Sequence, residues 1–206
     1  NAVGPLVMGN LSATGNLSLT SLAGPITQQA GSALIAYGTT SATATQGGVP
    51  TGITLSNAGN DLRGLVTVSG ANVAVATSGN LAIAGTAVNL TTLSGGATSF
   101  GTTTLTGGLS TTSVGDITQT GAITTGAPSS ITSTTGDIVL TNPDNAFFGA
   151  TSLTATLGDL SFAGSVAGSL ATTSGATTSF GTTTLTGGLT TTSVGDITQT
   201  GAITTG

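Results

Sequence analysis

Short runs in which apolar and polar residues alternate recur along the whole chain, and Gly, Asn or Asp bounds each run. In the run NVAVATSG, residues 72–79, Val73 and Val75 would face one side of an extended strand and the alanines between them the other. In the next run, NLAIAG, the larger pair is Leu81 and Ile83. The runs recur roughly every 8 to 14 residues, which leaves no room for crossover helices and predicts an all-β protein of short strands.

The chain also contains a long internal duplication, which spans several of these short runs. Thr98–Gly126 recurs as Thr178–Gly206 at an offset of 80 residues, and the single difference is Ser110 against Thr190. Chance similarity between β-rich segments does not produce such identity, so the pattern indicates recent duplication of a unit of about 80 residues. We therefore interpret residues 1–206 as a single repeat segment, and we expect it to be part of a longer protein.

A weaker copy adds a second kind of repeat. The run GITLSNAGNDLRG, residues 52–64, resembles DIVLTNPDNAFFG, residues 137–149. Both contain a strand pattern followed by N-x-x-N-x-x-x-G, formed by Asn57, Asn60 and Gly64 in the first copy and by Asn142, Asn145 and Gly149 in the second. The tripeptide ITQ also occurs three times, beginning at Ile26, Ile117 and Ile197.

The repeats favour stacking of like strand upon like strand, as in a parallel β-helix. A sandwich or a globular barrel would need a varied core with large side chains, whereas the inward candidates here are mainly Leu, Ile, Val and Ala. Coils of about 20 residues would make the 80-residue unit four whole coils. The chain would then form about ten coils and a rod of about 50 Å, at the ~4.8 Å spacing of hydrogen-bonded strands.

Composition narrows the possible partners. The chain has no Cys, His, Trp, Lys or Glu, its only basic residue is Arg63, and its net charge is −5. A single Arg cannot neutralise a phosphate backbone, so nucleic-acid binding is not expected. No apolar run approaches the ~20 residues of a membrane-spanning helix, so membrane insertion is not expected. The hydrophobic fraction of 37% argues against disorder, which combines low hydrophobicity with high net charge.

Several of the runs resemble the repeats of large filamentous-haemagglutinin-like exoproteins, which bacterial two-partner (type Vb) systems secrete. They are GNLSLTS, GPITQ, GDITQTGAITTG, GITLSNAGNDLRG and LVTVSGANVAVATSGNLAIAG, and the strand followed by N-x-x-N-x-x-x-G is the most specific of these features. The resemblance implies a right-handed parallel β-helix, export through an outer-membrane secretion pore, and a role as an adhesin or surface fibre. It supplies no active site.

The aspartates are the first candidates for chemistry. Four of them, Asp116, Asp137, Asp159 and Asp196, follow a Gly and precede Ile or Leu, where a turn leads into a strand. We expect their carboxylates to accept hydrogen bonds from local backbone amides. One isolated Asp in each coil offers too few oxygen ligands for calcium, so the sequence indicates no metal site.

No catalytic constellation is expected either. Asp61 and Arg63 form the only mixed-charge cluster, and the second copy of their segment has Ala146 and Phe148 at these positions. Ser and Thr are abundant, but nucleophilic catalysis needs a base beside the hydroxyl, and the chain has no His or Lys. We therefore predict no enzyme activity, no catalytic or cofactor-binding residues, and no cofactor.

The Thr runs and the Phe residues allow further predictions about the surface and the core. The run Thr102–Thr106 and its copy beginning at Thr182 could present stacked Thr arrays of the kind found on ice-binding β-solenoids. Phe147 and Phe148 are adjacent, so in a strand they would point to opposite sides, one into the core and one outward. Phe100 and Phe180 are equivalent by repeat, and we expect them to share one packing role.

The function expected from these observations is a structural and adhesive rod. It would be a segment of a secreted bacterial surface protein, outside the cell or on its surface, and would mediate cell-surface or biofilm adhesion. The expected partners are the outer-membrane secretion pore during export and then host or bacterial surface receptors or glycans, with self-association also open. The alternatives are a self-assembling extracellular filament subunit and a Thr-rich ice-binding solenoid.

Overall fold

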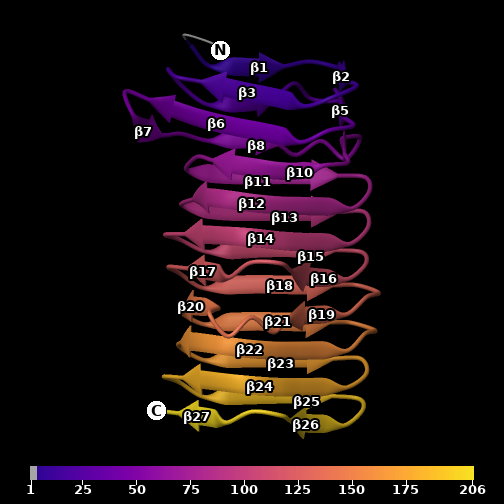
Figure 1. Ribbon diagram of the computed structural model, residues 1–206, viewed down its shortest axis with the longest axis vertical. Coiled ribbons are helices and arrows are strands. Elements are labelled where there is room, and N and C mark those ends of the chain that lie inside the picture. Colours follow the sequence, from indigo (N-terminus) through magenta and orange to yellow (C-terminus); the bar gives the residue numbers. More distant parts are fainter. Residues whose placement is uncertain (1–3) are drawn as a thin grey trace.

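Parallel strands stack into a β-solenoid of about 11 turns in the computed structural model, which describes residues 4–206. The strands run across the rod, and successive coils follow one another from the N-terminal end to the C-terminal end (Figure 1). The all-β, parallel β-helix prediction is confirmed, with about one turn more than expected. Among the described residues no helix is long and apolar enough to cross a membrane.

Three sheets form the walls of the rod. The ten-stranded sheet consists of β1 (Leu6–Met8), β4 (Ile26–Gln28), β8 (Ile53–Leu55), β11 (Asn72–Thr77), β13 (Asn89–Ser94), β15 (Leu109–Ser113), β18 (Ser129–Ser133), β21 (Thr151–Ala155), β23 (Leu170–Ser174) and β25 (Leu189–Ser193). The three-stranded sheet consists of β2 (Leu11–Ala13), β5 (Leu34–Ala36) and β9 (Asp61–Leu62). The fourteen-stranded sheet consists of β3 (Leu17–Ser21), β6 (Thr40–Gln46), β7 (Val49–Pro50), β10 (Leu65–Ser69), β12 (Leu81–Ala87), β14 (Thr98–Leu105), β16 (Ile117–Gln119), β17 (Ile123–Thr125), β19 (Ile138–Leu140), β20 (Ala146–Phe148), β22 (Leu160–Ala167), β24 (Thr178–Leu185), β26 (Ile197–Gln199) and β27 (Ile203–Thr205).

The strand register shows what the 80-residue duplication means in space. In the ten-stranded sheet Ser110 pairs with Ser130, Ser130 with Ser152, Ser152 with Ala171, and Ala171 with Thr190. Ser110 and Thr190 therefore occupy equivalent places four coils apart. The prediction that the long repeat is four whole coils is confirmed.

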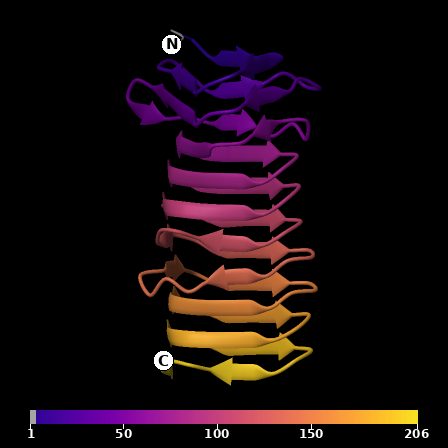
Figure 2. The same ribbon diagram turned by 45° about the vertical axis from the view of Figure 1, so that its right-hand side comes forward.

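One hairpin is added at the side of the parallel stack. Strand β7 pairs antiparallel with β6, and the turn between them contains Gly47 and Gly48 at φ of 58° and 81°. L-residues with a side chain rarely adopt these left-handed conformations, so glycine is the residue that fits both places. The hairpin projects from the side of the rod (Figure 2).

The core is a set of apolar ladders inside the coils. Val73, Val75, Leu81 and Ile83 are all buried, as their alternation predicts. Ala76 is buried as well, although it lies on the opposite side of β11 from the valines.

The phenylalanines follow the prediction. Phe147 is 1% exposed and Phe148 is 51% exposed, so the adjacent pair divides between core and surface. Phe100 and Phe180 are both buried, each on an equivalent strand of the fourteen-stranded sheet. The side-chain alternation of a strand is sufficient to produce this division.

Threonine also occupies core positions, and one such place yields a prediction. Thr98 is fully buried between Leu81 and Ile117, and its hydroxyl has no hydrogen-bond partner among residues 4–206. A buried hydroxyl without a partner costs about 1–3 kcal/mol, and Val has nearly the same shape. We expect Thr98→Val to raise the free energy of unfolding by about 1 kcal/mol, measured by chemical denaturation.

The control for that change is Thr92→Val. The Thr92 hydroxyl is also buried, but it shares a hydrogen bond with the Thr111 hydroxyl in the next coil. Removing it leaves Thr111 without this partner, so Thr92→Val should destabilise the rod. Equal effects of the two substitutions would contradict this explanation.

Candidate functional surfaces

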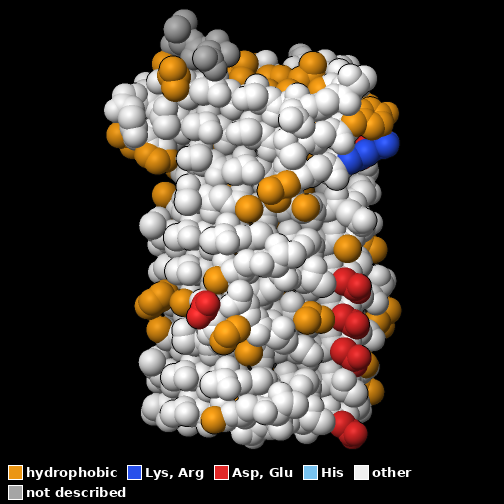
Figure 3. Space-filling model, viewed as in Figure 1, with side chains coloured by type: hydrophobic (Ala, Val, Ile, Leu, Met, Phe, Trp, Pro, Cys, Tyr) orange, Lys and Arg blue, Asp and Glu red, His pale blue; other side chains and the backbone are white. Residues whose placement is uncertain are grey.

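The aspartates at the turns form a column along the rod. Asp116, Asp137 and Asp159 come immediately before paired residues of β16, β19 and β22, so they stack in successive coils. The backbone N–H of Asp137 donates to Asp116 Oδ1 (2.9 Å), and that of Asp159 donates to Asp137 Oδ1 (2.8 Å). Figure 3 shows acidic side chains in a row along one edge of the rod.

This column corrects one detail of the sequence analysis. The carboxylates of Asp116, Asp137 and Asp159 do accept backbone amide bonds at the turns, but the amides belong to the neighbouring coil and not to the local turn. Asparagines do the same elsewhere, since Asn80 Oδ1 accepts from the N–H of Ala97 (2.9 Å) and Asn89 Oδ1 from that of Gly108 (2.9 Å). The turn residues therefore bond one coil to the next. No group of three or more His, Cys, Asp or Glu in residues 4–206 is arranged to hold a metal ion.

Asp159 is the member of the column whose titration reports on these bonds. The backbone N–H of Thr177 (2.8 Å) and the Thr177 hydroxyl (2.7 Å) both donate to Asp159 Oδ1, and they lower the pKa of this carboxyl below its ordinary 3.8. A lowered pKa means that the bonds stabilise the fold above about pH 4 and that this contribution is lost as the pH falls through the folded-state pKa.

We expect Thr177→Val to raise the pKa of Asp159 towards its ordinary value, because the hydroxyl donor is lost while the backbone donor remains. Thr177→Ser keeps the hydroxyl and should leave the pKa unchanged. Carboxyl carbon-13 NMR across an acid titration measures both variants. An unchanged pKa in Thr177→Val would show that the hydroxyl bond is absent in solution.

The second asparagine of each N-x-x-N motif lies inside the rod. Asn60 is fully buried, and its side-chain amide forms a reciprocal pair with that of Gln28, at 2.6 and 3.0 Å. Asn60 Oδ1 also accepts from the N–H of Leu34 (2.9 Å), while Nδ2 donates to the carbonyl oxygens of Leu55 (3.0 Å) and Ala76 (3.2 Å). The side chain therefore joins several separate segments of the chain.

Asn145 repeats this arrangement bond for bond. Its amide pairs reciprocally with Gln119, at 2.9 and 2.8 Å, and its Oδ1 accepts from the N–H of Ile123 (3.0 Å). Nδ2 donates to the carbonyl oxygens of Leu140 (3.3 Å) and Ala163 (3.2 Å). Gln28 and Gln119 are the glutamines of two ITQ tripeptides, so the two weak repeats act together as one Asn–Gln clamp.

Arg63 and its neighbours form the one mixed-charge cluster predicted from the sequence. Its guanidinium bonds Asp61 Oδ2 at 2.7 Å and lies 4.3 Å from the centre of the Tyr37 ring. The hydrogen bond to Asp61 raises the pKa of Arg63. The Arg and Asp side chains are 53% and 32% exposed, and exposed pairs of this kind contribute little to stability. The cluster holds a stacked surface arginine and offers no free base.

The outward face of the ten-stranded sheet is the most regular surface of the rod. From β13 to β25 its outward residues form two columns, with two residues in each coil. The first column is Thr91, Ser110, Ser130, Ser152, Ala171 and Thr190. The second column is Leu93, Thr112, Thr132, Thr154, Thr173 and Thr192. We call these twelve residues the hydroxyl face; ten of them are Ser or Thr, and none is charged.

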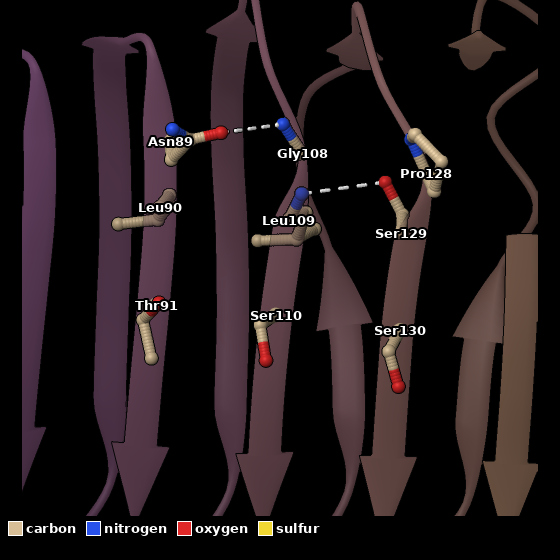
Figure 4. Close-up of a pocket in the computed structure, with 9 residues that line it drawn as sticks. All are labelled: Asn89, Leu90, Thr91, Gly108, Leu109, Ser110, Pro128, Ser129 and Ser130. Atoms are coloured by element: carbon tan, nitrogen blue, oxygen red, sulfur yellow. Dashed lines mark hydrogen bonds between the residues drawn. The ribbon is translucent and has the colours of Figure 1, made fainter. Parts of the chain in front are cut away.

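A shallow groove of about 380 Å³ crosses one end of this face. It runs over the beginnings of β13, β15 and β18, where Thr91, Ser110 and Ser130 lie side by side (Figure 4). Pro128 and Asn89 border it. The groove is lined by neutral groups throughout, so it suits a neutral partner and has no group that would attract an ion.

The Thr runs singled out from the sequence do not form this face. In Thr102–Thr106, which includes the end of β14, Thr103 is buried and only alternate residues are exposed; the same holds for Thr183 in the second copy. The strand register also shifts at this place in the fourteen-stranded sheet. The regular Thr column lies on the other large sheet, and the sequence reasoning missed it.

No curated protein and no solved structure matches the chain. One protein family does match, described as "Repeats of unknown function (DUF5649)", over residues 1–69, 85–154 and 167–206. These three segments cover most of the chain and include both Asn–Gln clamps and both copies of the long duplication. This solenoid of stacked, internally bonded coils therefore belongs to the DUF5649 family of repeats of unknown function.

Proposed function

We propose that this chain is a structural and adhesive rod segment of a secreted bacterial surface protein. It holds binding surfaces away from the cell and contributes one of its own, the hydroxyl face. The observation that carries the proposal is the uninterrupted stack of about 11 turns, in which each coil bonds to the next through strands, turn residues and clamps. Solenoids of this kind extend in one dimension and present long surfaces to their partners.

Two further observations support the extracellular part of the proposal. The repeats resemble those of filamentous-haemagglutinin-like exoproteins, which are exported through an outer-membrane pore. The chain also contains no Lys and one Arg, so trypsin-like proteases have a single place to cut. The partners that fit this function are host or bacterial surface receptors or glycans and other copies of the rod.

Adhesion of protein-coated beads tests the proposal. Beads carrying the purified segment are offered to host cells, to carbohydrate surfaces and to like-coated beads. We expect saturable binding to at least one of these, competed by soluble protein. A triple variant of the hydroxyl face, Thr112→Lys with Thr132→Lys and Thr154→Lys, should lose the binding.

The matched control places the same charge elsewhere. Thr104, Ser165 and Thr184 are exposed residues on the fourteen-stranded sheet, and changing all three to Lys should leave binding intact. Absence of binding to every surface would reduce the segment to a spacer and contradict its adhesive role. Loss of binding in the control alone would move the adhesive surface to the other sheet.

A further inference from the structure

We propose that the hydroxyl face pairs with the hydroxyl face of a second copy of this chain, so that rods associate side by side. The proposal rests on the proposed adhesive function and names the partner of the same surface. Five properties of the face support it: its flatness, its lack of charge, its side-chain chemistry, its area, and one knob with one groove.

The face is flat because the ten-stranded sheet keeps its register. None of the ladders from β11 to β25 in this sheet contains a shift. The fourteen-stranded sheet, in contrast, shifts register at Gly85 and Gly164, and several of its coils carry two short strands in place of one. Two flat faces with the same row spacing can interdigitate over their whole length, as paired sheets do in steric zippers.

The charges of the chain lie away from this face. Asp116, Asp137, Asp159 and Asp196 stand at turns before the fourteen-stranded sheet, and Asp144 lies in the loop between β19 and β20. With a net charge of −5, two copies repel each other in most orientations. The hydroxyl face allows close approach without desolvating a charge, and it lacks the charged residues that commonly protect exposed sheets from pairing.

Threonine and serine can satisfy themselves across such an interface. A hydroxyl both donates and accepts, so a row of hydroxyls finds partners in an identical row. The rod already uses this pairing internally, since the Thr172 hydroxyl donates to that of Thr191 at 2.7 Å. Thr is also stiff at χ1, so burying it costs less side-chain entropy than burying a long side chain.

The area of the hydroxyl face is sufficient for a specific pair. Six strands, β13 to β25, at ~4.8 Å spacing and with about five residues of ~3.4 Å each give the hydroxyl face about 29 by 17 Å. The resulting ~490 Å² on each copy, or ~1,000 Å² for the pair, reaches the size at which specific interfaces begin.

One protruding side chain and one groove on the hydroxyl face determine how the two copies align. Leu93, at the end of β13, is half exposed and is the only large apolar side chain on the hydroxyl face. The groove described above crosses the beginnings of β13, β15 and β18. A two-fold axis parallel to the rod places the strand ends of one copy over the strand starts of the other, so that each Leu93 faces the partner's groove, as an isologous interface requires.

Sedimentation equilibrium and a cross-linking experiment test this inference. We expect the wild-type segment to form dimers. In the variant carrying Thr132→Lys, Thr154→Lys and Thr173→Lys, each copy places three charges on the partner's first column, close to the partner's own three lysines, so the dissociation constant should rise by about 100-fold or more. The variant with Thr104, Ser165 and Thr184 changed to Lys should dimerise as wild type, and circular dichroism shows whether all three proteins are folded.

The chain has no Cys, so single cysteines give a clean second readout. With a short bis-maleimide, Ser152→Cys should link two copies, and Thr184→Cys, on the other sheet, should not. The reverse pattern, or a wild-type segment that stays monomeric at all concentrations, overturns the inference. A monomeric segment that shows thermal hysteresis would also overturn the inference. If the Thr132, Thr154 and Thr173 variant loses that hysteresis, the hydroxyl face binds ice.

The two proposals can fail separately. If the segment is monomeric but coated beads still bind cells or glycans, the adhesive function stands and only the second copy is wrong as the partner. If like-coated beads clump and the segment dimerises through the hydroxyl face, both proposals hold.

Discussion

Replacing Phe147 with Ala should lower the free energy of unfolding by about 3–5 kcal/mol, the usual cost of removing a fully buried aromatic ring. Phe147 stacks between Thr125 and Val166 of the adjoining coils, and its ring centre lies 6.0 Å from that of Phe162. Each coil packs only on its neighbours, so no distant segment can move in to fill the cavity.

The adjacent residue is the control for this prediction. Phe148 is half exposed, and Phe148→Ala should change the stability by about 0.5 kcal/mol or less. Chemical denaturation followed by circular dichroism compares the two variants directly. Similar destabilisation by both would mean that β20 does not divide its phenylalanines between core and surface.

Asn145→Ala should be similarly destabilising, by about 3–5 kcal/mol. The substitution removes one half of the Asn–Gln clamp and leaves the Gln119 amide and the N–H of Ile123 without these partners inside the rod. Each buried polar group left unpaired costs about 1–3 kcal/mol. Denaturation midpoints measure the loss, and amide hydrogen exchange of the coils on either side of β20 should show the opening locally.

Asn80→Ala is the matched control for the clamp. Asn80 is exposed at a turn and accepts one hydrogen bond from the N–H of Ala97, so its loss should cost about 1 kcal/mol or less. The double variant with Gln119→Ala and Asn145→Ala should be less destabilised than the sum of the single changes, because each substitution breaks the same pair. Full additivity would show that the two side chains do not act together.

The fold could be predicted from the sequence because every level of its pattern agrees. Alternation predicted that Val73 and Val75 lie in the core, and the spacing of the short strand runs predicted the coil length. The two copies of the Asn motif, however, lie on different walls. Strand β8 of the first copy belongs to the ten-stranded sheet, and β19 of the second belongs to the fourteen-stranded sheet. Sequence similarity therefore identifies the local strand and turn, but it does not tell to which sheet the strand belongs.

The role of the Asn motif also escaped the sequence. Its half-buried partner, Gln119 or Gln28, lies in the preceding coil, at a separation of 26 residues in one copy and 32 in the other. The hairpin formed by β6 and β7 lies between Gln28 and Asn60 and lengthens that coil. The separation between the Gln and the Asn therefore differs between the two copies. The joint occurrence of ITQ before each N-x-x-N was the one available signal.

The hydroxyl face was hidden for a related reason. Its column at Thr112, Thr132, Thr154, Thr173 and Thr192 is regular in space, but the coils that separate its members differ in length by up to three residues. A search of the sequence for a fixed period therefore does not detect the column. It detects the contiguous Thr runs, in which alternate residues are buried. Only the strand register aligns its members.

The stiffness of the rod underlies every inference above, and a distance between two spin labels measures it most directly. Thr86 and Thr184 are exposed on the fourteen-stranded sheet and lie five coils apart through Thr104, Thr124, Ala146 and Ser165. With both changed to Cys, labelled, and diluted in unlabelled protein, they should give one narrow distance near ~24 Å, at ~4.8 Å for each coil. A broad distribution centred near the ~50 Å of a flexible chain of this length would contradict the account.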